Sequence, residues 1–353
     1  MHDRAATIRY SRGRYSSLIT LVYMTIKTLL KFIVSGLLLY ILVRTIELED
    51  FQRVISKVSP TMVVLVAIGY MGGQFISIIK WWMILRGNEG AGVQRNSAIA
   101  NDHKPARVTL KKVAQAYLTG MFVNVLGIGT VGGDMTRAII VSDVNHPKTM
   151  CLATVAADRA HGLVVLTFIG VISVVLFGGN MLPLWLWLVL SLGGFCVILL
   201  WFIGPEILLR VVPETHQLRL KAEQLSRAIP RDPATVLMIT ALSVVFHLWQ
   251  IGLHQGMAQA LGVTVPWPTL LVSIPFVNVL SNLPISWQGL GVRENGYAFF
   301  LVPNTLDYEQ ALAMGVIWLF AVTSSGAVGG LLSLLMINQK QTTVGVVANS
   351  LRP

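Results

Sequence analysis

Six apolar runs of this chain are long enough to cross the hydrocarbon core of a bilayer, which is about 30 Å thick. They lie near residues 26–45, 61–79, 159–178, 182–203, 235–260 and 311–337. Charged residues make up only 12% of the 353 residues, whereas soluble domains carry about 25%. Too little polar surface remains to solvate a globule of this size. The sequence therefore predicts an all-α polytopic membrane protein.

Two further apolar segments, near 113–130 and 270–287, are interrupted by glycines and charges. The first carries Asn124, Gly132, Gly133, Asp134 and Arg137, and the second carries Asn282, Gln288, Gly289, Gly291, Arg293 and Glu294. When the two asparagines are aligned, Gly133 and Gly291 both fall nine positions later. Non-helical backbone is tolerated at membrane depth only where it is buried in protein or lines a wet cavity. Interrupted segments in corresponding positions of two halves indicate a transporter binding site, so we expect the substrate at these breaks.

The basic residues give a test of topology, because cytoplasmic connections carry an excess of Lys and Arg. They gather in the tail 1–25, which we expect to be retained, and in the connections 80–112 and 204–233, with Lys340 after the last run. All of these segments fall on one side if 113–150 and 270–303 are re-entrant hairpins that enter from opposite faces. An inverted repeat has this arrangement.

We therefore predict one transmembrane domain over 26–338, with six full spans, two re-entrant hairpins and cytoplasmic tails 1–25 and 339–353. A chain with eight full spans is the alternative, but it would place 204–233 outside. The stretch 206–228 alternates apolar and charged residues. This pattern is typical of an amphipathic helix at the cytoplasmic interface, or of a solvated linker helix.

The first break offers an anion site. We expect Asp134 to start a helix and to cap its free amides. The same amides and the helix dipole attract anions, and Arg137 adds a planar donor fork one turn later. In the alternative interpretation, Asp134 and Arg137 only cap the helix and pair with each other.

The second break and the run near 159–178 add further charges. Arg293 and Glu294 start the helical arm that follows the break, where we expect them to be buried; exposed to water, they would form an ordinary surface pair. Asp158 and Arg159 open the run near 159–178, where Arg159 pairs with Glu294, meets a headgroup phosphate or reaches the interface. Three arginines (Arg137, Arg159, Arg293) would then face three acids (Asp134, Asp158, Glu294), a balance that a purely structural network would share.

No nucleophile motif, Walker loop or dinucleotide fingerprint occurs in the sequence, and we predict no catalytic residue, no cofactor and no ATP-driven pump. No carboxylate or Cys lies at ligand spacing beside His247 and His254, so we predict no metal site. The net charge of +11 would suggest nucleic acid as the partner of a soluble protein. Here the basic residues flank apolar runs, so we expect anionic lipid instead.

Three motifs together resemble the lysylphosphatidylglycerol synthase transmembrane-domain family, the flippase-like integral membrane proteins. They are Gly132-Gly-Asp-Met-Thr-Arg137, Asp158-Arg159 and Leu283-Pro-Ile-Ser-Trp-Gln-Gly-Leu-Gly-Val-Arg-Glu294, and the resemblance covers about 30–340. It implies a membrane domain that moves or accommodates phospholipid, with headgroups handled at the two hairpins. Larger members carry a soluble aminoacyl-transferase domain. The few residues after 337 leave no room for one, so we do not expect lysyl transfer by this chain alone.

The resulting hypothesis is a lipid transporter of a bacterial-type inner (plasma) membrane, with both termini cytoplasmic. It would bind and translocate an anionic phospholipid or a lipid-linked headgroup between the two hairpins. The alternatives are a non-catalytic partner of a separate synthase or glycosyltransferase, and a membrane transferase that acts on a lipid phosphate with Glu294 or Asp134 as base.

Overall fold

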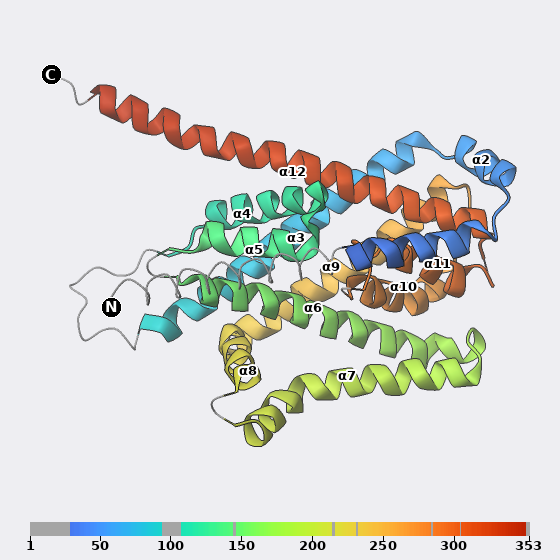
Figure 1. Ribbon diagram of the computed structural model, residues 1–353, viewed down its shortest axis with the longest axis horizontal. Helices are drawn as coiled ribbons and strands as arrows, with labels where there is room; N and C mark the ends of the chain where they lie inside the picture. The colour runs from blue at the N-terminus through green and yellow to red at the C-terminus, as the bar shows by residue number, and fades with distance from the viewer. Residues whose placement is uncertain are drawn as a thin grey trace, which may run out of the picture.

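The computed structural model describes residues 29–93, 107–143, 146–213, 216–230, 232–283, 285–303 and 305–350. The predicted tail 1–25 and the last residues, 351–353, of the predicted tail 339–353 lie outside these ranges. Every regular element within the ranges is helical, as Figure 1 shows. In chain order they are the helix Leu29–Val43, α2 (Leu48–Ser56), α3 (Pro60–Val93), α4 (Leu110–Val123), a π-helical turn (Asn124–Ile128), α5 (Gly129–Val141), α6 (Lys148–Phe177), a 3-10 turn (Gly178–Asn180), α7 (Leu184–Val211), α8 (Gln217–Ala228), α9 (Pro233–Ala260), α10 (Trp267–Asn282), α11 (Val292–Leu301) and α12 (Tyr308–Ser350).

Five helical stretches in the described part of the chain are long and apolar enough to cross a membrane. They are Pro60–Gly87, Lys148–Asn180, Leu184–Gly204, Pro233–Ala260 and Tyr308–Met336. A sixth span is possible if Leu29–Val43 and Leu48–Ser56, which bend by 94° at their junction, cross together. Large apolar side chains such as Leu184 and Phe202 lie exposed on the outer surface. An aqueous globule would hide such side chains, so the prediction of an all-α polytopic membrane protein is confirmed.

Both interrupted segments fold as helical hairpins. In the first hairpin (α4–α5), Gly120 faces Gly133, and Lys112 Nζ donates to the carbonyl of Val141 over 2.8 Å. In the second hairpin (α10–α11), Val277 packs on Gly296 and Phe276 stacks on Phe300. The paired positions run in opposite chain directions, so the two helices of each hairpin are antiparallel. With 14 and 16 residues, α4 and α10 are about 21 and 24 Å long at 1.5 Å per residue, shorter than the hydrocarbon core.

The two hairpins come from opposite ends of the bundle and meet at their tips. In Figure 1 the first hairpin lies on the left, near the start of α6, and the second lies on the right with the α9–α10 connection. At the junction, the Gln288 side-chain amide donates to the carbonyl of Asn124 over 2.6 Å. The junction joins chain positions 164 residues apart, and it places both breaks in the middle of the bundle.

Long helices surround the hairpins and fix their positions. α12 passes along α4, where Gly329 contacts Leu118 and Gly330 contacts Phe122. α3 packs along α9, and the Trp249 indole of α9 donates to the carbonyl of Gly69 over 2.8 Å. Small residues at such contacts let helices approach closely, which is how helices associate in lipid.

The structure corrects two of the boundaries predicted from sequence. The amphipathic stretch does not begin at 206, because α7 continues to Val211 and the separate short helix α8 starts only at Gln217. The connection predicted from residue 80 is also wrong at its start. Lys80 lies inside the span Pro60–Gly87, and only 5% of its surface is exposed.

Candidate functional site

A cavity of about 300 Å³ lies where the two hairpin tips meet α3, α6 and α9. Of the residues that we predicted to bind substrate, its wall contains Asn124, Gly133, Asp134, Arg137, Asp158, Arg159, Asn282, Gln288 and Arg293. Gly132, Gly289, Gly291 and Glu294 are absent from the wall. The fold thus brings charged residues from both breaks and from α6 around one space.

The first hairpin turns through a π-helical segment, which widens the helix and releases backbone groups from the regular ladder. The Asn124 side-chain oxygen accepts a hydrogen bond from the Gly133 amide over 3.0 Å, while the Asn124 carbonyl accepts from Gln288. A Cβ atom on Gly120 would lie 2.8 Å from the carbonyl oxygen of Gly133. Only glycine allows this approach, so Gly120 and Gly133 let α5 fold back directly onto α4.

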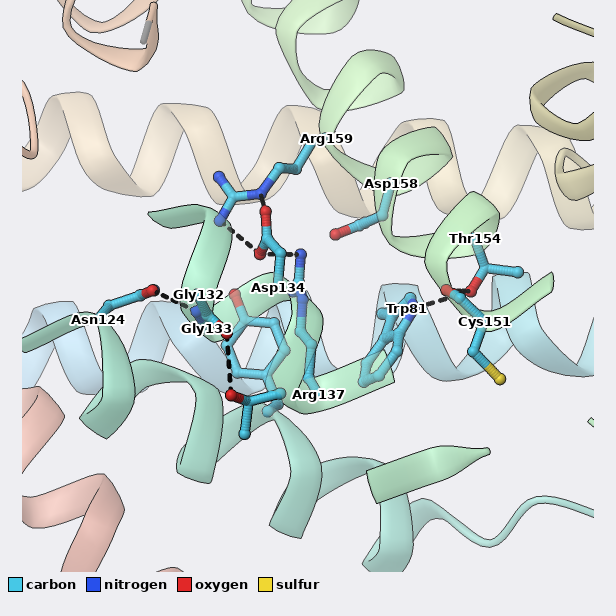
Figure 2. Close-up of polar contacts among 12 residues, drawn as sticks. Trp81, Asn124, Gly132, Gly133, Asp134, Arg137, Cys151, Thr154, Asp158 and Arg159 are labelled. Carbon is cyan, nitrogen blue, oxygen red and sulfur yellow. Dashed lines mark hydrogen bonds and ion pairs between the residues drawn. The ribbon is translucent and has the colours of Figure 1, made fainter. Parts of the chain in front are cut away.

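Asp134 is the anionic centre of the first hairpin. Its carboxylate is held by Arg137 Nη2 at 3.0 Å and by Arg159, whose Nη2 donates over 2.8 Å and whose Nε also contacts it. Figure 2 shows the two arginines converging on Asp134 from α5 and α6. The predicted helix start at Asp134 is wrong: α5 begins at Gly129, so this carboxylate lies inside the helix and pairs with arginines.

Arg137 is fixed by aromatic rings as well as by Asp134. Its guanidinium carbon lies 5.2 Å from the ring centres of both Trp81 and Tyr117, a distance at which a cation is attracted to an aromatic face. The Trp81 indole donates to Thr154 over 3.3 Å, as Figure 2 shows, and Trp81 is fully buried. The guanidinium of Arg137, with 6% of its side chain exposed, is therefore held rigidly at the cavity wall.

Asp158 pairs with a base that we did not select from sequence. Lys80 Nζ lies 2.9 Å from Asp158 Oδ1, and both side chains are more than nine-tenths buried. The same ammonium group donates to Ser243 on α9 over 3.2 Å. This ion pair joins α3 to α6 inside the membrane-spanning part of the bundle. A buried pair of this kind needs good geometry and further hydrogen bonds to offset its desolvation.

The second hairpin turns on three residues with left-handed backbone. Gly289 and Gly291 have φ of 77° and 82°, and Gln288 has φ of 51°. Positive φ is uncommon outside glycine, and such strain clusters at functional sites. This conformation lets Gln288 reach Asn124 with its side chain, while its carbonyl accepts from Arg293 Nη2 over 3.1 Å.

Arg293 and Glu294 start α11, as expected, but they point to different places. Arg293 lines the cavity and its guanidinium carbon lies 5.7 Å from the ring centre of Trp318. Glu294 is 2% exposed, and its Oε2 accepts from the Gly291 amide over 2.6 Å, which caps α11. Of the three roles considered for Arg159, pairing with Glu294 is therefore wrong, because Arg159 binds Asp134.

Sequence reasoning also missed the polar face of α3. Tyr70, Gln74, Ser77 and Lys80 all line the cavity. They recur every three or four positions within an otherwise apolar run, and this spacing puts them on one face of a helix. This periodicity could have indicated the polar face of α3 from the sequence alone. Ser281 and Trp318 also line the cavity, and they carry no comparable signal because single serines and tryptophans are common in membrane helices.

Comparison with known proteins agrees with the motifs. A family model described as the lysylphosphatidylglycerol synthase TM region matches residues 28–329. The matched stretch contains the helices of both hairpins and every residue of the cavity wall. A search of curated proteins finds no match to this chain. Since the family match covers most of its length, the chain belongs to the lysylphosphatidylglycerol synthase TM region family.

Proposed function

We propose that this protein is a lipid transporter that binds the anionic headgroup of a membrane lipid in the cavity between the two hairpins and moves it across the bilayer. The main support for this proposal is the cavity of about 300 Å³. It is lined by Lys80, Arg137, Arg159 and Arg293 and lies within a bundle of helices long enough to span a membrane. Charged residues inside a membrane bundle are costly and mark substrate pathways. Arginine forks suit phosphate, which they bind through paired hydrogen bonds.

The shape of the first hairpin supports a lipid as substrate. On α5, Gly133, Asp134 and Arg137 line the cavity, whereas the apolar side chains Val131 and Ile139 are 53% and 50% exposed. One face of the helix is therefore polar and the other is suited to lipid. A headgroup could enter beside α5 while its acyl chains stay in the hydrocarbon.

We further propose that the two hairpins are re-entrant and that both termini lie in the cytoplasm of a bacterial-type inner (plasma) membrane. The connections on the right of Figure 1, 178–183, 261–266 and 302–307, contain no Lys or Arg. The opposite end, where α4 and α6 begin and α8 lies (Figure 1), carries basic residues, since these elements include Lys111, Lys148 and Arg227. By the positive-inside rule, the basic end is cytoplasmic. The bend before α3 carries Arg44, Arg53 and Lys57, fewer basic residues than the opposite end, so the difference in count still favours this orientation.

Headgroup movement in proteoliposomes tests the proposal. Lipids with a fluorescent tail and different anionic headgroups are placed in both leaflets, and a membrane-impermeant quencher reports how fast the protected headgroups reach the outer leaflet. We expect the purified protein to accelerate this exchange and Arg293→Ala to abolish it. Arg210→Ala removes an equally charged side chain that is 82% exposed outside the cavity and should leave exchange unchanged.

The same vesicles separate the alternatives. Mass spectrometry of the lipids after incubation should show no new product, since we propose no catalytic role for Asp134 or Glu294. A modified lipid would replace transport by a transferase function. Exchange that appears only when a separate synthase or glycosyltransferase is co-reconstituted would favour the role of a non-catalytic partner.

A further inference from the structure

We infer that the cavity selects a headgroup with two negative charges, of the phosphate monoester class. The inference deepens the proposed function and rests on it. Among the described residues of the wall, four side chains are basic (Lys80, Arg137, Arg159, Arg293) and two are acidic (Asp134, Asp158). The wall therefore carries two positive charges more than its own acids neutralise.

The ion pairs show where the two excess charges lie. Lys80 and Asp158 neutralise each other at 2.9 Å. Asp134 is shared by Arg137 and Arg159, so one positive charge remains at the first hairpin. Arg293 has no carboxylate within ion-pair distance among the described residues, and its Nη2 donates to the neutral carbonyl of Gln288. The second positive charge therefore lies at the second hairpin.

The same two sites hold unused donors. The Nε atoms of Arg137 and Arg293 are buried and have no hydrogen-bond partner within the described part of the chain. Buried donors are almost always satisfied, and an unneutralised charge in a low-dielectric bundle is unfavourable. Both observations point to a ligand that brings acceptor oxygens and negative charge into the cavity.

No described group next to the cavity is placed to supply that charge. Glu294 is the nearest remaining acid along the chain, but it caps the Gly291 amide and lies outside the wall. The other titratable groups of the wall are Tyr70, Tyr117 and His247, none of which carries negative charge as a neutral phenol or imidazole. The neutralising charge must therefore come with the ligand.

The number of charges then selects the headgroup chemistry. A phosphodiester carries one negative charge, which would leave one arginine unneutralised. A phosphate monoester carries about 1.5 to 2 negative charges at pH 7, because its second pKa is about 6, and neighbouring arginines lower that pKa further. It also offers three terminal oxygens, which can accept hydrogen bonds from more than one side of the cavity. Neutral donors in the wall such as Asn282 and Ser281 suit the rest of the headgroup.

Equilibrium binding to the full-length purified protein in mixed micelles tests the inference with three probes. They are a phosphatidic acid (lipid monoester), a phosphatidylglycerol with identical acyl chains (lipid diester) and inorganic phosphate. We expect the lipid monoester to bind about tenfold or more tightly than the diester, as expected for one additional charged hydrogen bond. Arg293→Gln should reduce this preference to near unity, whereas Arg293→Lys, which keeps the charge, should retain most of it.

Two further variants keep the test decisive if Arg293→Gln folds poorly. Asp134→Asn adds one excess positive charge and should increase the preference for the monoester. Arg210→Gln, at an exposed ion pair outside the cavity, should leave it unchanged.

Equal affinity for monoester and diester overturns the inference and leaves lipid transport standing. Binding of inorganic phosphate without either lipid overturns both the inference and the proposed transport of lipid, because the site would then take free phosphate. The absence of binding by all three probes also overturns both.

Discussion

Replacing Asp134 by asparagine should lower the stability of the ligand-free protein and raise its affinity for anions. The carboxylate of Asp134 pairs with Arg137 and Arg159, so it competes for these arginines with any phosphate group in the cavity. Breaking a buried ion pair by removing one partner costs about 3–5 kcal/mol. The Arg159 side chain is 37% exposed and part of its interaction is screened by solvent, so we expect a loss of about 2–3 kcal/mol in the absence of anion.

An anion should reverse this loss. A ligand that binds only the folded state stabilises it by RT ln(1 + [L]/Kd). If release of the two arginines tightens phosphate binding about tenfold, the variant gains about 1.4 kcal/mol more from saturating phosphate than the wild type does. The assay is unfolding in detergent micelles, by heat or denaturant, over a series of inorganic phosphate concentrations.

The control is Asp50→Asn, which removes a carboxylate from the exposed pair with Arg53 on α2. It should change neither the stability by more than about 0.5 kcal/mol nor the response to phosphate. If phosphate stabilises wild type and Asp134→Asn by the same amount, then Asp134 does not compete with anions, and our interpretation of the arginine pair is refuted.

Four further predictions follow from the local geometry. Gly133→Ala should cost about 2–4 kcal/mol of unfolding free energy, because the added methyl group overlaps the Asn124 side chain and the Gly120 carbonyl. The control is Gly72→Ala on α3, where no atom lies within 4 Å of the added carbon; it should be neutral or stabilising by about 0.5–1 kcal/mol. An equal loss of stability in both variants would contradict the close contact of Gly133 with α4. Gln288→Gly should be less destabilising than Gln288→Ala in the same unfolding assay, since both lose the hydrogen bond to Asn124 but only glycine relieves the positive φ. In a chain with Cys151 and Cys196 replaced by alanine, a water-soluble maleimide should reach Lys148→Cys, an exposed position where α6 begins, from the cytoplasmic side and Pro303→Cys from outside, and the opposite result at either position would overturn the re-entrant topology. Burial raises the pKa of Asp143, but hydrogen bonds from His146 and Lys112 outweigh it and lower the pKa to about 2. Because the pKa in the unfolded chain is about 3.9, the resulting stabilisation is present above about pH 4 and is lost as the pH falls toward 2. Asp143→Asn should remove this acid dependence from the free energy of unfolding.

The spans could be predicted from sequence because a single physical requirement sets them. A helix that crosses lipid needs a predominantly apolar run of about 20 residues, and the runs 182–203 and 235–260 match the spans Leu184–Gly204 and Pro233–Ala260 closely. The start of α9 also had a local signal, since Asp232 caps the Thr235 amide over 2.8 Å. The positions of the two breaks could be predicted for a similar reason, because clusters of glycines and charged residues are unusual inside an apolar segment.

The pairing of charges could not be predicted in the same way, because tertiary packing decides it. The residues next to Asp134 do not indicate that α5 begins at Gly129, directly after a π-helical turn. They also do not indicate that this carboxylate lies within hydrogen-bond distance of Arg159. Lys80 was assigned to a connection because a lone charge near the end of an apolar run usually reaches the interface. Its partner Asp158 is 78 residues away, and only the packing of α3 on α6 shows that the pair is buried.

The buried Lys80–Asp158 pair has a consequence for how the protein is made. Synthesis proceeds from the N-terminus, so α3 enters the membrane before α6 has been translated, and Lys80 arrives there without its partner. A lysine at the centre of a nascent span opposes insertion by about 2.5–3.5 kcal/mol, and Lys80, seven residues before the end of its span, opposes it by less. The other residues of the 28-residue span Pro60–Gly87 must outweigh that opposition until Asp158 arrives. If Lys80 and Asp158 were exchanged between α3 and α6, the acid would enter the membrane first. The unpaired charge during insertion of α3 would then be negative.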